Sequence, residues 1–200
     1  GLAAVIFSTI VVMNMLNGAI FLKNRLELRV VIGAVLGLSG IILVFWPEVS
    51  DFETGSENLF AATLAVLATF LASLGNIASA RNQREGIPVI QSNTYGMTYG
   101  ALLMLVLAWS TGREFNFEFT VSYVSSLVFL SVFASIIAFW SYLTLLGRVG
   151  VERAAYATLI FPLVALGIST IFESYQWSAY AVIGIVLILG GNLLILKRSI

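Results

Sequence analysis

The chain has 200 residues, of which 60% are hydrophobic and 10% are charged, and its formal net charge is zero. A soluble domain of this length is about half apolar and a quarter charged, so the composition predicts an integral membrane protein and gives no indication of a nucleic-acid partner. The sequence contains no Cys and no His, which excludes disulfides and the commonest transition-metal ligands. We therefore expect no metal ion and no cofactor.

The first residue is Gly rather than Met, and no charged segment precedes the first apolar run. This start argues against a signal peptide and favours a chain whose beginning is missing or trimmed. Apolar runs of about 20 residues, the length that crosses a bilayer, occur seven times. They predict helices over 2–22, 30–46, 59–80, 89–110, 121–146, 153–172 and 177–196.

With seven spans, the connections alternate between the two sides of the membrane. Nine of the ten Lys and Arg residues then fall on one side, and only Arg113 falls on the other. Cytoplasmic connections carry the excess of basic residues, so we expect a cytoplasmic C-terminus in a bacterial inner membrane. Arg84 and Arg148 should be cytoplasmic, and Glu53 and Glu118 external.

Residues 31–43 are repeated at 182–194 after a constant shift of 151 positions. The matches include Gly33 with Gly184 and Gly40 with Gly191. Because the helix at 2–22 corresponds to the one at 153–172, five spans later, the two copies cross the membrane in opposite directions. Inverted repeats of this kind are typical of secondary transporters.

The repeat unit is expected to have five helices. Residues 1–47 would then be the last two helices of a first repeat, 48–58 an external acidic loop, and 59–200 a complete second repeat. Three further helices would belong before Gly1, and without them we expect poor expression or oligomerisation and no transport. The fold class is accordingly all-α, a polytopic bundle with seven visible helices of a 5+5 inverted-repeat transporter.

The stretches 154–173 and 177–191, with the preceding Y-L-T-L-L-G-R-V-G at 142–150, resemble the EamA-type branch of the drug/metabolite transporter superfamily. The resemblance covers essentially the whole chain through loose, apolar motifs. It implies two five-helix repeats, a transport activity and, as a direction, export. The first copy departs from the pattern, because Val11 stands at the equivalent of Pro162 and Leu22 at that of Glu173.

No Asp, Glu, Lys or Arg falls inside a predicted span. An ionisable group within the membrane is a functional indicator, and its absence disfavours a proton relay, a retinal protein and an intramembrane enzyme. We therefore expect no catalytic residue and no enzymatic activity. Neutral hydrogen bonding and aromatic stacking remain, and these suit a pathway for polar organic solutes.

The candidate pathway residues are polar or aromatic side chains inside the spans, together with a mid-helix proline. Each has an alternative in helix packing or inter-helix hydrogen bonding, and the small residues beside Ser73 and Asn76 favour close packing of that face. Asn76, Asn93, Tyr99 and Trp140 are expected to converge on one central space. The full set is Asn14, Asn17, Ser73, Asn76, Asn93, Tyr95, Tyr99, Ser135, Trp140, Thr158 and Pro162.

These features predict a transporter that moves a small polar or amphipathic metabolite, or a drug-like compound, by alternating access between the repeats. The alternative is a non-transporting membrane subunit or receptor, which would have no water-accessible cavity between the repeats. The expected partners are the lipid bilayer and a small-molecule substrate, with no nucleic acid, and a homo-oligomer stays open.

Overall fold

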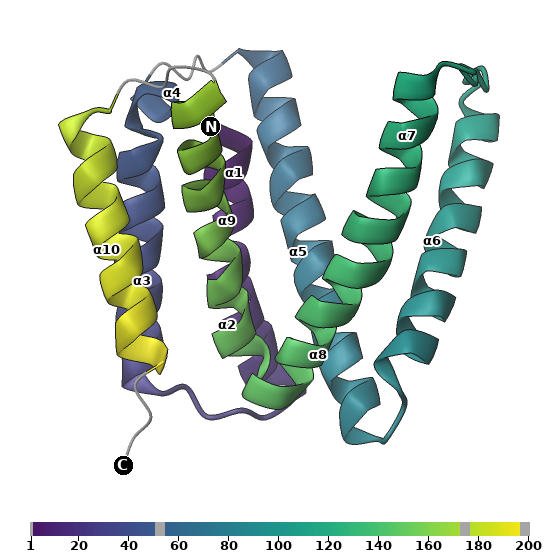
Figure 1. Ribbon diagram of the computed structural model, residues 1–200. Coiled ribbons are helices and arrows are strands. Elements are labelled where there is room, and N and C mark those ends of the chain that lie inside the picture. The colour runs from purple at the N-terminus through teal and green to yellow at the C-terminus, as the bar shows by residue number, and fades with distance from the viewer. Residues whose placement is uncertain (1, 51–54, 173–176, 197–200) are drawn as a thin grey trace. The chain divides into compact units, whose positions relative to one another are not determined.

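The computed structural model describes residues 2–50, 55–172 and 177–196, and the chain divides into two compact units. Unit 1 comprises residues 1–78 and 149–200, and unit 2 comprises residues 79–148. All regular structure in the described ranges is helical, which confirms the all-α prediction (Figure 1). In chain order the helices are α1 (Leu2–Ser8), α2 (Ile10–Phe21), α3 (Leu28–Val44), α4 (Trp46–Ser50), α5 (Ser56–Arg84), α6 (Val89–Ser110), α7 (Val121–Phe129), the π-helix η1 (Leu130–Ala138), α8 (Phe139–Val149), α9 (Val151–Phe172) and α10 (Ala179–Leu196).

Each of the seven predicted ranges coincides with helix, but the first is interrupted at Thr9. The Thr9 N–H bonds to the carbonyl of Ile6 at 3.1 Å, one residue nearer than in an α-helix. The Thr9 hydroxyl donates to the same carbonyl at 2.6 Å, and the Ser8 hydroxyl donates to Ala4 at 2.7 Å. Hydroxyls that bond back to the preceding turn tend to bend helices, so α1 and α2 form one helix with a local tightening.

The predicted helix at 121–146 contains nine π-helical residues, η1, between α7 and α8. A π-helix shifts the hydrogen bonds to i→i+5 and is rare outside short insertions. Hydrophobic runs do not distinguish this geometry from an α-helix, so the π-helix was not predicted from the sequence.

The predicted acidic loop at 48–58 is partly helical. α4 occupies its start, with Pro47 in the first turn, where a missing N–H leaves no hydrogen bond unmade. α5 begins at Ser56, three residues before the predicted helix. Residues 51–54, which include two of the acidic residues, lie outside the described residues.

Four helical segments are long and apolar enough to cross a membrane, namely Ala3–Phe21, Glu57–Arg84, Val121–Val149 and Val151–Ile168. Two shorter apolar helices cover Leu28–Val44 and Ala179–Ile195. α6 is not among these segments, because Gln91, Ser92 and Asn93 make its first turns polar. The fold is therefore a polytopic membrane helix bundle, while the count of seven crossings and their sidedness stay predictions.

In unit 1, α3 and α10 lie side by side (Figure 1) and approach so closely that glycine is required at the contact. A Cβ atom added to Gly40 would lie 2.6 Å from the carbonyl oxygen of Gly184, and one added to Gly184 would lie 2.5 Å from that of Gly40. Small residues let helix backbones approach in lipid, where packing replaces the hydrophobic driving force. The order of contacts along the two helices makes them antiparallel.

The same contact has the symmetry of the sequence repeat. Gly33 faces Gly191, with a Cβ-to-carbonyl distance of 3.1 Å from one side and 2.9 Å from the other. The shift of 151 positions turns the Gly33–Gly191 contact into the Gly184–Gly40 contact. A self-complementary contact of this kind is what a two-fold axis produces between equivalent surfaces.

α9 packs against α3 within the same unit. The Tyr156 hydroxyl donates to the carbonyl of Val30 at 2.7 Å, and Leu159 lies against Gly37. Gly33 and Gly37, one turn apart on α3, are therefore both in close contact with neighbouring helices. The fully buried side chains of this core include Val11, Ile41, Val44, Leu159 and Ile188.

The expected packing face of α5 is only partly buried. Ala68, Ala72 and Gly75 are exposed, and a Cβ atom on Gly75 would meet nothing within 4 Å. The buried face carries Thr69, Ser73 and Asn76. Ser73 and Asn76 are hydrogen-bonded to α2, so this side of α5 faces the rest of unit 1.

Unit 2 contains the end of α5, α6, α7, η1 and most of α8. Gln83 donates to the carbonyl of Leu143 at 2.9 Å and lies over Gly147, which ties α5 to α8. Gly86 and Gly112 end α5 and α6 with φ of 82° and 66°, a conformation that side chains with a Cβ avoid. None of the residues of α6, α7 or η1 is buried within the chain.

Candidate functional site

Four of the predicted pathway residues meet in unit 1, between α2 and α5. Asn17 Nδ2 donates to Ser73 Oγ at 2.9 Å, and Asn76 Nδ2 donates to Asn14 Oδ1 at 3.4 Å. Their exposures are 0% for Asn14 and Ser73, 5% for Asn17 and 7% for Asn76. We call these four residues the amide node.

Helix geometry accounts for the amide node. Asn14 and Asn17 are three residues apart on α2, and Ser73 and Asn76 are three residues apart on α5, so each pair shares one face of its helix. The first residue of each pair bonds to the second residue of the other. Neutral hydrogen bonds between membrane helices contribute about 0.6 kcal/mol each, which orients the faces without locking them.

One donor of the amide node has no partner. Asn14 Nδ2 is buried and makes no hydrogen bond. Burying an amide without a compensating hydrogen bond costs about 1–3 kcal/mol by mutational measures. Native structures rarely retain such a group without a reason, and a ligand that supplies the acceptor is one.

The other buried hydroxyls of unit 1 are bonded within their own helices. Thr69 Oγ1 donates to Ala65 at 2.8 Å, and Thr158 Oγ1 donates to Ala155 at 2.5 Å. The Thr158 hydroxyl is therefore satisfied within α9. Pro162 lies inside α9, and its side chain is outside the described part of the chain.

The remaining predicted residues lie in unit 2. Tyr95 and Tyr99 are 64% and 66% exposed, and their rings stack at a centroid distance of 6.3 Å. Asn93 and Ser135 are partly buried, and Trp140 is exposed. Asn76 belongs to unit 1, so its convergence with Asn93, Tyr99 and Trp140 stays a prediction.

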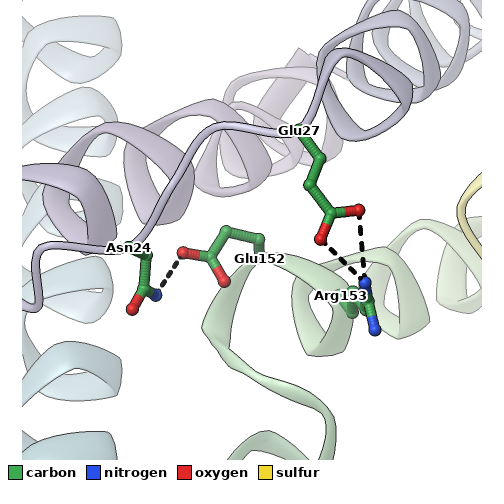
Figure 2. Close-up of polar contacts among 4 residues, drawn as sticks. All are labelled: Asn24, Glu27, Glu152 and Arg153. Carbon is green, nitrogen blue, oxygen red and sulfur yellow. Dashed lines mark hydrogen bonds and ion pairs between the residues drawn. The ribbon is translucent and has the colours of Figure 1, made fainter. Parts of the chain in front are cut away.

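A second polar cluster lies beyond the C-terminal end of α2 and was not predicted from the sequence. Asn24 Nδ2 donates to Glu152 Oε1 at 2.5 Å (Figure 2). One terminal nitrogen of Arg153 donates to both carboxylate oxygens of Glu27, at 3.1 and 3.3 Å. Of these residues, the sequence analysis used only Arg153, as one of the basic residues that set the topology, because 126 to 128 positions separate the partners.

Asn192 is a further buried amide that sequence reasoning missed. It is 7% exposed on α10, and its Nδ2 atom makes no hydrogen bond. Its equivalent after the shift of 151 positions is Ile41, which is fully buried. The repeat alignment could have identified Asn192, because one copy has an amide where the other has an apolar side chain.

No group of three or more Asp and Glu residues in the described ranges could hold a metal ion. Lys23, Arg25 and Glu27 lie in the connection between α2 and α3, and Arg29 lies in the first turn of α3. The site is thus a neutral hydrogen-bonding surface inside an integral membrane bundle.

This combination of apolar helices, paired repeat glycines and buried neutral amides defines a polytopic membrane helix bundle with a neutral polar site in its interior. The sequence profile of the EamA-like transporter family matches residues 59–197. The chain belongs to the EamA-like transporter family.

Several curated relatives have transporter names. The chain is 24% identical to an uncharacterised transporter of Clostridium kluyveri, covering 96% of this chain and 62% of that protein. It is 23% identical to protein PagO of Salmonella typhimurium, covering 100% and 65%. It is 22% identical to the uncharacterised transporter YvbV of Bacillus subtilis, covering 98% and 63%. The chain therefore spans a little under two thirds of the length of these relatives.

A solved crystal structure shares the fold. It matches with a TM-score of 0.80 at 21% identity, over 96% of this chain and 66% of that one. The family name and the names of the Clostridium kluyveri and Bacillus subtilis relatives describe transporters, a class distinct from enzymes.

Proposed function

We propose that the protein carries a small polar or amphipathic compound, a metabolite or drug-like molecule, across the inner membrane by alternating access between inverted repeats. The direction proposed is export. The amide node forms part of the pathway, and the observation that carries this assignment is the unpaired Asn14 Nδ2.

The chemistry of the amide node selects the ligand. Its four side chains are uncharged, and its free group is a donor, so a bound compound must present a hydrogen-bond acceptor such as a carbonyl oxygen. A compound with net charge would be transferred from water without a counter-ion, at a cost that neutral amides do not offset. Uncharged or zwitterionic compounds with a carbonyl or carboxylate acceptor fit best.

The two-fold packing of α3 on α10 supports the transport mechanism. Equivalent helices from opposite copies form a tight antiparallel pair through Gly40 and Gly184. In inverted-repeat transporters, equivalent elements exchange roles as the site turns from one side to the other. The contact between the copies would act as the fixed axis of that exchange.

Flux from proteoliposomes tests the proposal. Vesicles containing the protein expressed from its complete coding sequence are loaded with a mixture of uncharged and zwitterionic carbonyl compounds and the acceptor-free cation tetraphenylphosphonium, and retention is measured by mass spectrometry. We expect protein-dependent loss of one or more acceptor compounds. The Asn14→Ala variant should lower that rate about tenfold, the effect of one hydrogen bond of about 1.4 kcal/mol.

The matched control is Leu16→Ala, which alters an exposed side chain on the same helix. Rates are normalised to folded protein, because Asn14→Ala also removes the Asn14 Oδ1 atom to which Asn76 Nδ2 donates. No flux of any compound from well-folded protein would contradict the proposal and favour a non-transporting subunit or receptor.

A further inference from the structure

The second polar cluster joins two parts of unit 1 that are far apart in the sequence. Asn24 and Glu27 belong to the connection between α2 and α3, and Glu152 and Arg153 belong to the first turn of α9 (Figure 2). In terms of the repeat, the connection is in the first copy and α9 is in the second. The Asn24–Glu152 and Glu27–Arg153 contacts therefore bridge the two copies at the end predicted to be cytoplasmic.

Glu152 also covers α2 directly. A Cβ atom on Gly18 would lie 2.5 Å from Glu152 Oε1, so the carboxylate rests on the last turn of α2. Gly18 follows Asn17 and is four residues after Asn14, on the face that carries the amide node. The Glu152 side chain thus lies over the end of that face, beside the amide node.

These contacts can open at low cost. The Glu27 and Arg153 side chains are 54% and 39% exposed, and exposed ion pairs contribute about 0–1 kcal/mol. The α3–α10 contact differs, because its glycines bring backbone against backbone. A movement that separates the copies at this end would break the side-chain contacts before the glycine packing.

We propose that Asn24, Glu27, Glu152 and Arg153 form a latch that closes the cytoplasmic side of the amide node and opens during the transport cycle. The latch rests on the proposed transport function. In the structure the latch is closed, and Asn14 and Asn17 are 0% and 5% exposed. Release of Glu152 from Asn24 and Gly18 would give cytoplasmic water and substrate access to the node.

The absence of native cysteine allows a direct test. A single cysteine replaces Asn17, and its reaction with a membrane-impermeant maleimide is followed in inside-out vesicles. Adding Glu152→Ala should raise the labelling rate about tenfold or more, the change for roughly 1.4 kcal/mol of lost closure. Glu27→Arg and Arg153→Glu should each raise it alone, and the double charge swap should return it toward the starting rate.

Two controls separate latch opening from general loosening. Glu85→Gln breaks the exposed Arg81–Glu85 pair, 3.1 Å apart, and should leave labelling unchanged. A cysteine at Leu26, which is 49% exposed, should react fast in every background. Should Glu152→Ala not fold, the charge-swap series supplies the same readout by itself.

Unchanged labelling of the Asn17 position in the Glu152 and single charge variants would overturn the latch. An increase that the charge swap fails to reverse would also overturn it. Maleimide labelling does not require transport, so the latch and the proposed transport function can be contradicted independently. A latch-dependent labelling rate without flux would contradict the proposed function alone, and flux with latch-independent labelling would contradict the latch alone.

Discussion

At the scale of the residue, the site depends on a few neutral polar groups that are buried where lipid offers no alternative partner. The Asn17–Ser73 bond satisfies one amide at 2.9 Å, whereas Asn14 Nδ2 and Asn192 Nδ2 have no partner. An unpaired buried amide lowers the free energy of unfolding, so a native structure retains one where the amide has another role, such as binding a ligand. A structural role therefore predicts that a substitution in the amide node lowers the free energy of unfolding, whereas a pathway role predicts that it lowers the rate of flux.

A double-mutant cycle on Asn17→Ala and Ser73→Ala tests the structural role. We expect each single change to lower the free energy of unfolding and the pair to show a coupling of about 0.6 kcal/mol, the mean for hydrogen bonds between membrane helices. Chemical denaturation in mixed micelles measures it. The control pair Asn17→Ala with Thr69→Ala should be additive, since Thr69 bonds within α5. A coupling near zero for the first pair would contradict the bond.

At the scale of the element, glycine position rather than glycine content decides how α3 and α10 pack. Gly184 lies against the backbone of Gly40, while a Cβ atom added to Gly190 on the same helix would meet no atom of another described element within 4 Å. The hydrophobic pattern of α10 does not separate these two residues. Their repeat partners do, because Gly184 matches Gly33 and Gly190 matches Ser39.

Replacing Gly184 by Ala should destabilise the protein, because the new methyl group would lie 2.5 Å from the Gly40 carbonyl and 2.7 Å from Val44. Overpacking of this kind costs about 1–3 kcal/mol. Thermal unfolding in detergent measures the loss. Gly190→Ala is the matched control and should be neutral or slightly stabilising, since Ala has the higher helix propensity. Equal effects of the two changes would refute the close contact.

At the scale of the whole molecule, the distribution of basic residues sets the expected orientation in the membrane. Nine of ten Lys and Arg residues lie on one predicted side, and the bias of short connections determines topology. The expected orientation does not depend on how the helices pack, because it is derived from the order of the spans along the chain. Only this predicted orientation assigns the amide node and the latch to a side of the membrane.

Single-cysteine labelling in intact cells checks the orientation. Cysteine at Glu118 should react with an impermeant maleimide from outside, and cysteine at Arg84 should react only after the membrane is permeabilised. The nine-to-one asymmetry of basic residues is the reason. Cysteine at Arg148 serves as a second cytoplasmic position. Reaction at Arg84 but not at Glu118 in intact cells would reverse the assigned sides.

The sequence by itself determined the class of the protein, its helices and the repeat. Length and apolarity are enough for this, since a bilayer requires about 20 apolar residues per crossing, and the glycines at 33, 40, 184 and 191 recur at a constant shift. It also marked Asn14, Asn17, Ser73 and Asn76 as candidates, because buried amides are rare in lipid. Tertiary structure alone decided which candidates meet, that Thr158 is satisfied locally, and that Asn24 and Glu152 bond across 128 positions. The physical reason is that composition and periodicity report the environment of a residue, whereas a hydrogen bond depends on the crossing of two helices, which is set by all of their packing contacts together.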